Sequence, residues 1–347
     1  MFGFKSVSRL LSCATALVAG LASVSAQNGP VTIDKTIASS VVASQFDLAS
    51  QGYAFLLREA SSHDFFLLGE LHGDNEIPAL IQRLWPEMWK LGYRHVAAEI
   101  SPWAAQQLEF MPDDEGRKIE GLWTREQASI AHAPAGARTT VIWGCDMEEV
   151  QPQYPIRDLA SLNPDDANLQ RMVALTANGY SRTLAPELLS LLSSSRSGKD
   201  TASNGISLRE NLIATLQIEK DRISAATRSA AQNRRELLMK QQFLEHYRNV
   251  DPGKVLLRFG QAHLFRGLDN KRGVSTMGNF VAEFAVTLNL TVFNVAAFGA
   301  GGEYRLNGRT FSADQRPDEP AFAWLASRRS SKARFSTCDR CACRCTS

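Results

Sequence analysis

Several familiar catalytic motifs are absent from this sequence of 347 residues. It has no G-x-S-x-G nucleophile elbow, no G-x-x-x-x-G-K-[ST] phosphate loop and no H-E-x-x-H zinc-binding helix. Serine hydrolases of the elbow type, P-loop nucleotide hydrolases and zincin proteases therefore lose support. Cysteine is also scarce, because residues 27–327 contain only Cys145. No dyad pattern marks this residue as a nucleophile, and we expect a buried, unreactive thiol.

No stretch beyond the N-terminal region reaches the length of a membrane-spanning helix, so we expect no transmembrane segment. The first 26 residues have a different pattern. Lys5 and Arg9 precede an apolar run over residues 10–22, and small residues follow as far as Ala26. This order predicts a signal peptide over residues 1–26 and an exported protein, either periplasmic or extracellular.

The small positive net charge of +2 comes from the two ends of the chain. Residues 1–26 carry +2 and residues 328–347 carry +5, which leaves −5 for residues 27–327. A protein that binds nucleic acid needs a basic face, which a body of negative net charge disfavours, and we expect no nucleic-acid partner. The basic segment 328–347 also holds four closely spaced cysteines, from Cys338 to Cys345. Four thiols within one short turn cannot easily surround a zinc ion, so we expect a disordered tail.

Residues 27–327 alternate between short apolar runs and amphipathic helical patterns. Five runs are predicted to form strands, at residues 64–68, 95–98, 139–143, 255–259 and 290–297. Helical patterns between strands favour right-handed β-α-β units. The sequence therefore predicts an α/β domain with a mostly parallel sheet flanked by helices. A largely helical insertion, at about residues 155–250, separates the third strand from the fourth.

Polar or ionisable side chains follow four of these strands. Glu70 and His72 follow the first, Glu99 the second, Asp146 the third and His263 the fourth. The carboxyl ends of parallel strands share one edge of a sheet, where ligands commonly bind. We therefore expect these residues to converge, although an Asp after a strand can also cap a helix.

Two imidazoles near carboxylates suit two kinds of chemistry. Glu70, His72 and His263 could bind a divalent metal such as zinc, manganese or iron. Without a metal, the same groups could provide a general base and a carboxylate that orients it. Arg235, on a predicted helix, is a candidate substrate-binding residue together with Asp146. It could contact the carboxylates or remain solvated.

The ordered motifs resemble the superfamily that joins erythromycin esterase-like hydrolases, Tiki-type metalloproteases and ChaN-like haem-binding lipoproteins. They are LLGELHGDNEIPALI (67–81), VAAEISPW (96–103), GCDME (144–148), RRELLMKQQFLEHY (234–247), FGQAHLFRG (259–267) and STMGNF (275–280). The resemblance implies an α/β sheet with a site of Glu70, His72, Glu99 and His263. The E-x-H spacing is nearer the ChaN-like form, whereas G-x-x-H at residues 260–263 is nearer the Tiki form.

These observations predict an exported hydrolase that cleaves a small-molecule ester or lactone. His72 would deprotonate water directly or on a metal, with Glu70 orienting the ring. His263 would stabilise the oxyanion or share the metal, and Glu99 would position water. The alternatives are a non-catalytic haem- or metal-binding protein and a Tiki-like metalloprotease. Four tyrosines are equally open as haem ligands: Tyr93, Tyr154, Tyr180 and Tyr247.

Overall fold

The computed structural model describes most of the region between residues 50 and 312. The described residues are 50–73, 76–110, 140–148, 151–195, 198–200, 202–203, 205–250, 253–269, 273–299, 302–306 and 309–312. The predicted signal peptide and the Cys-rich tail lie outside them. Phe55–Ala313 form one compact unit, to which the sheet and the candidate site belong.

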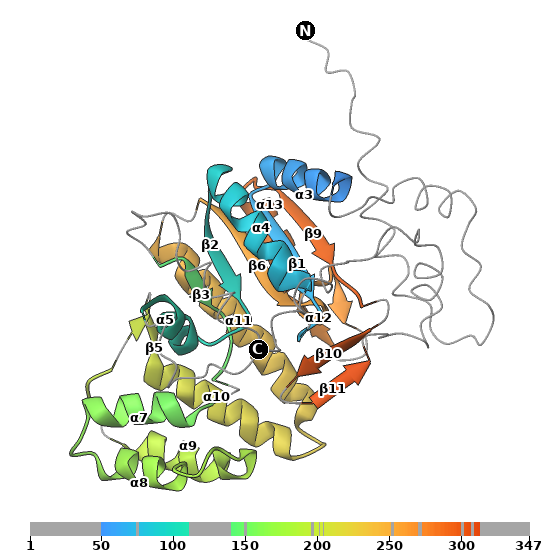
Figure 1. Cartoon of the computed structure of the whole chain (residues 1–347). Helices are drawn as coiled ribbons and strands as arrows, with labels where there is room; N and C mark the ends of the chain where they lie inside the picture. Colours follow the sequence, from blue (N-terminus) through green and yellow to red (C-terminus); the bar gives the residue numbers. More distant parts are fainter. Residues whose placement is uncertain are drawn as a thin grey trace, which may run out of the picture. The chain divides into compact units, whose positions relative to one another are not determined.

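A five-stranded parallel sheet forms the centre of this unit, in the order β3-β2-β6-β1-β9 (Figure 1). The strands are β1 (Phe65–Glu70), β2 (Tyr93–Ala98), β3 (Ile142–Gly144), β6 (Lys254–Gly260) and β9 (Val292–Ala296). All residues of β1 are buried, as in strands covered on both faces. Each strand overlaps a predicted one, and the predicted α/β fold is confirmed.

Helices cover both faces of the sheet. On one face, side chains of β1 and β6 such as Leu67 and Leu257 pack with Met239, Phe243 and Val281. Those three residues belong to α11 (Arg228–Asn249) and α13 (Met277–Thr287). The other face is covered by α4 (Glu76–Lys90), which crosses in front of the strands in Figure 1. Phe55 of α3 (Gln51–Ser62) packs edge-on against Phe293 of β9. The apolar side of α4 is buried, as the 3.6-residue periodicity requires.

The predicted helical insertion lies between β3 and β6. Its helices are α7 (Gln153–Leu162), α8 (Ala167–Leu175), the 3₁₀ turn η2 (Arg182–Leu184), α9 (Ala185–Ser194), α10 (Leu208–Ile223) and α11. The Ser/Gly-rich segment before α10 contains a small hairpin of β4 (Ala202–Ser203) and β5 (Ile206–Ser207). Ser207 caps α10 by accepting a hydrogen bond from the Glu210 amide. Because α11 also packs on the sheet, the insertion is tied to the core.

Two short helices and two hairpins complete the described residues. The helices are α5 (Pro102–Phe110) and α12 (Gln261–Leu264), which follow β2 and β6. The hairpins are β7 (Leu268–Asp269) with β8 (Val274–Ser275), and β10 (Glu303–Leu306) with β11 (Arg309–Ser312). Among the helices in the described ranges, none combines the length and the apolar character needed to cross a bilayer.

Candidate functional site

The structure brings the six candidate residues together at the carboxyl edge of the sheet. Glu70 ends β1, and His72 lies in the turn that follows it. Glu99 directly follows β2, and Asp146 comes shortly after β3. The remaining two are His263, in the short helix after β6, and Arg235, on α11. The parallel topology therefore assembles side chains that are up to 193 positions apart in the sequence.

Glu70, His72 and Glu99 form the first half of a continuous row. The Nδ1 atom of His72 lies 3.2 Å from Glu70 Oε1, and its Nε2 atom lies 3.4 Å from Glu99 Oε2. Gly260 makes this packing possible, because a Cβ atom there would lie 2.5 Å from His72 Nε2. The Gly260 amide also donates to Glu99 Oε2 at 2.6 Å. His72 is thus held between two carboxylates.

Glu99 and His263 continue the row to a residue that the sequence analysis missed, Glu236. His263 Nε2 lies 3.3 Å from Glu99 Oε1, and its Nδ1 lies 2.5 Å from Glu236 Oε1. The other oxygen of Glu236 accepts from the Met277 amide at 3.1 Å. In view of the function proposed below, we name Glu70, His72, Glu99, His263 and Glu236 the catalytic row. Its order alternates carboxylate and imidazole.

Two arginines flank the row, Arg258 fully buried and Arg235 partly buried. Arg235 donates to Glu99 Oε1 and to Asp146 Oδ1, both at 2.9 Å, and also contacts Asp146 Oδ2. The sequence left open whether Arg235 contacts the carboxylates or is solvated, and the structure shows the contact. Arg258, which the sequence analysis also missed, donates to Glu70 Oε2 at 2.6 Å from within β6. A lone charge in the apolar run VLLRF was the signal that could have identified it.

The charges of the row change the pKa values of its members. Burial alone would raise the pKa of Glu70, but the Arg258 charge and His72 outweigh burial and lower it. Burial opposes the charged form of His72 as well, yet its hydrogen bonds with Glu70 and Glu99 raise its pKa to about 10. The same balance, with the Glu99 charge and a bond to Glu236, raises the pKa of His263 to about 9.

These pKa values favour imidazolium for both histidines near neutral pH. An imidazolium can donate a proton or stabilise an oxyanion. It becomes a base only after it loses its own proton, so base catalysis by His72 should increase as the pH rises. His72 is also the member of the row that a ligand can reach, since 24% of its side chain is exposed against 7% or less for the others.

The predicted metal ligands are not arranged as one coordination set. Glu70 and His72 contact each other, while His263 lies beyond Glu99. Glu99, the carboxylate between the two imidazoles, is already held by the Arg235 guanidinium, which would repel a cation. Across the described ranges, no three His, Cys, Asp or Glu side chains form a metal-binding group. The arrangement therefore does not fit a resident divalent metal, and metal binding stays a prediction.

The tyrosines considered as haem ligands differ in accessibility. Tyr93 is buried, and its hydroxyl donates to the carbonyls of Ala60 and His63. Tyr247 packs within the aromatic cluster around Phe243. Tyr247, Tyr154 and Tyr180 are partly buried, and haem binding stays a prediction that rests on the resemblance. Cys145 is fully buried, and burial raises the pKa of its thiol, which suits the expected unreactive thiol.

Comparisons with known proteins identify the fold without naming a family. Neither the models of protein families nor the curated proteins give a match to this chain. A solved Bacillus cereus protein is similar with 13% identity and a TM-score of 0.50, covering 79% of this chain and 77% of that one. A structure described as a succinoglycan biosynthesis protein has 14% identity and a TM-score of 0.51, covering 87% and 80%. At such identities these similarities establish a shared fold alone.

Proposed function

We propose that this protein is an exported hydrolase that opens an ester or lactone of a small molecule. The observation that carries this proposal is the catalytic row, in which two imidazoles alternate with three carboxylates and one of the imidazoles, His72, is partly exposed. Hydrolysis needs a group that accepts a proton from water and a second group that stabilises the oxyanion. The row offers both at one edge of the sheet.

In the proposed reaction, the neutral form of His72 removes a proton from water. The water oxygen adds to the carbonyl carbon, and the carbonyl oxygen becomes an oxyanion near the His263 imidazolium. The intermediate then loses its alkoxide, which takes the proton from His72 and leaves as an alcohol. Glu70 orients His72, Glu99 holds both imidazoles, and Arg235 with Asp146 contributes to substrate binding. The products are a carboxylic acid and an alcohol, or a single hydroxy acid when the substrate is a lactone.

Replacing His72 with Ala tests this assignment. Because Glu70 and Glu99 keep their arginine partners, the variant should fold. His63 supplies the matched control, since it precedes β1 and so lies at the opposite end of that strand. We expect His72→Ala to abolish turnover in a screen of esters and lactones, and His63→Ala to retain it. A fully active His72→Ala protein would reject the assignment.

The alternative functions are separated by two further measurements on the same protein. A Soret shift with tight stoichiometry on haem titration would favour a ChaN-like binding protein. Peptide cleavage that EDTA stops and that manganese, cobalt or zinc restores would favour a Tiki-like metalloprotease. Export is tested by sequencing the N-terminus of the mature protein, which should begin at Gln27.

A further inference from the structure

A second group of buried polar side chains lies next to the catalytic row but takes no part in it. Glu148, Asn211 and Gln242 are each at most 5% exposed. Gln242 Nε2 donates to Asn211 Oδ1 at 2.7 Å, and Asn211 Nδ2 donates to Glu148 Oε1 at 2.9 Å. The amides of two helices, α10 and α11, therefore orient the Glu148 carboxylate.

Glu148 differs from the other buried carboxylates in the described part of the chain because no cationic side chain contacts it there. The other pairs are Glu70 with Arg258, Glu99 and Asp146 with Arg235, Glu219 with Arg182 and Arg222, and Glu236 with His263. A buried carboxylate is costly unless a positive charge or a proton compensates it. Burial accordingly raises the pKa of Glu148 to about 7. A cation from a ligand would give Glu148 the positively charged partner that the other buried carboxylates have within the protein.

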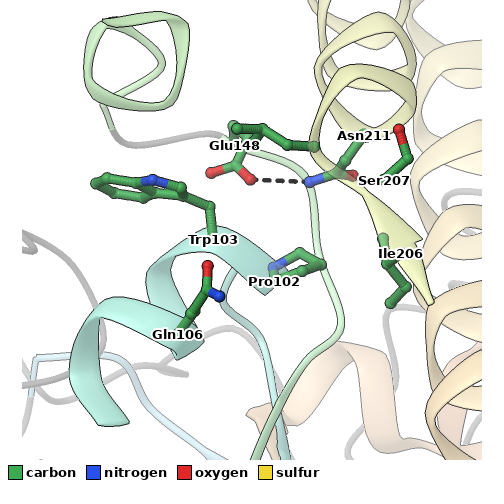
Figure 2. Close-up of a pocket in the computed structure, with 8 residues that line it drawn as sticks. Pro102, Trp103, Gln106, Glu148, Ile206, Ser207 and Asn211 are labelled. Atoms are coloured by element: carbon green, nitrogen blue, oxygen red, sulfur yellow. Dashed lines mark hydrogen bonds between the residues drawn. The ribbon is translucent and has the colours of Figure 1, made fainter. Parts of the chain in front are cut away.

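The Glu148 side chain lines a small pocket between α5 and α10 (Figure 2). Trp103 and Gln106 of α5 line one side, and Ser207 and Asn211 line the other. The indole of Trp103 is fixed, because its Nε1 donates to Asp158 Oδ2 at 2.8 Å and its ring stacks on Tyr154. Glu148 is the one charged residue among the described side chains that line this pocket.

We propose that this pocket binds the protonated amino group of a ligand. Glu148 already accepts hydrogen bonds from Asn211, the Ser101 side chain and the Trp103 amide. A carboxylate can accept about four, so one position remains for an N–H donor. The indole adds a surface that attracts organic cations. A metal ion would require several oxygen ligands. The side-chain oxygen of Asn211 already accepts a hydrogen bond from Gln242, so it is not open to a metal.

Two segments of the chain contribute to both the pocket and the candidate site. Pro102, in the pocket wall, is three residues after Glu99, and Glu148 is two residues after Asp146. On this proposal, the rest of a ligand with its amino group on Glu148 would extend toward the row. Binding of the amino group does not depend on the proposed function. The further inference that the ester of this ligand reaches His72 does rest on it. The substrate class becomes an amine-bearing ester or lactone.

The test compares n-propylammonium with n-propanol, a neutral molecule of similar size, on the full chain. The readout is the NMR shift of the Trp103 indole N–H during titration. We expect saturable binding of propylammonium and at least about tenfold weaker binding of propanol, because a charge-assisted bond is the stronger one. This comparison requires no variant. Equal affinities for the two molecules would overturn the proposal.

Variants and metal ions complete the design. Glu148→Gln should weaken propylammonium binding by at least about tenfold, because it removes the charge but keeps the shape. Glu109→Gln is the matched control, since this carboxylate on α5 binds the Ile142 amide outside the pocket. Unchanged binding in Glu148→Gln, or tighter competition by sodium or magnesium, would reject an ammonium site. His72→Ala should bind propylammonium normally, so this proposal can fail or succeed separately from the hydrolase assignment.

Discussion

Gly260→Ala is a small change that should disable the catalytic row while the fold survives. Gly260 has φ −53° and ψ 137°, values that alanine adopts without strain. The added Cβ atom would lie 2.5 Å from His72 Nε2, 3.0 Å from its Cε1 and 3.2 Å from Glu99 Oε2. The atoms it meets are the ends of side chains, so the His72 ring can move while the backbone stays in place.

The expected effect follows from the distance that the ring must move. Normal contact begins near 3.4 Å, so the ring has to shift by about 1 Å. A misplacement of about 1 Å can cost about 100-fold in rate, or about 2.7 kcal/mol of transition-state stabilisation. The glycine-to-alanine change is itself mild at a compatible backbone position. The free energy of unfolding should nevertheless fall near neutral pH, because His72 loses part of the stabilisation that its raised pKa represents.

Three measurements check this prediction. They are kcat/KM on whichever ester the wild-type protein hydrolyses, the pKa of His72 by NMR, and thermal unfolding. The pKa of His72 should fall from about 10, because the ring loses its bonds with Glu70 and Glu99. Gly198→Ala is the control, since the three atoms nearest to its Cβ would all belong to the side chain of Asn163, in the helical insertion. Normal activity with an unchanged His72 pKa would refute the reasoning.

Three further predictions concern the core and the row. His246 is buried and its pKa is lowered to about 4, so the unfolded chain takes up its proton first as the pH falls. The free energy of unfolding should therefore fall by about 3 kcal/mol between pH 6.5 and 4, and urea titrations of the wild type and His246→Phe should differ in this slope. Glu236→Gln should lower the pKa of His263 from about 9, as NMR titration can measure; an unchanged value would contradict the role of Glu236. Leu257→Ala should cost about 2–5 kcal/mol in urea unfolding, whereas Leu237→Ala, on the exposed side of α11, should cost much less.

The sheet could be predicted from the sequence because its strands are buried on both faces. A run such as residues 255–259 is apolar except for Arg258, and helical patterns separate the runs, which favours parallel pairing. Once the strands are parallel, their carboxyl ends share an edge, so Glu70, Glu99 and His263 could be expected there. Local sequence patterns were therefore enough to predict which residues follow the strands and lie at this edge of the sheet.

The partners of these residues could not be predicted in the same way. Glu236 lies among charged residues on α11, and its contact with His263 depends on how that helix is rotated against the sheet. The burial of Arg235 depends on the same rotation. The small hairpin β4–β5 was not expected either, since two-residue strands carry no clear periodicity. Tertiary packing decided each of these features.

The long helix α11 has a consequence for protein engineering. Its 22 residues place Arg235 and Glu236 at the catalytic row, Phe243 in the core and His246 against the Gly144 carbonyl. A rotation by one residue, about 100°, would displace all of these contacts together. A designer who transfers the strand ends to another α/β scaffold would therefore have to transfer α11 with them, in the same rotational setting.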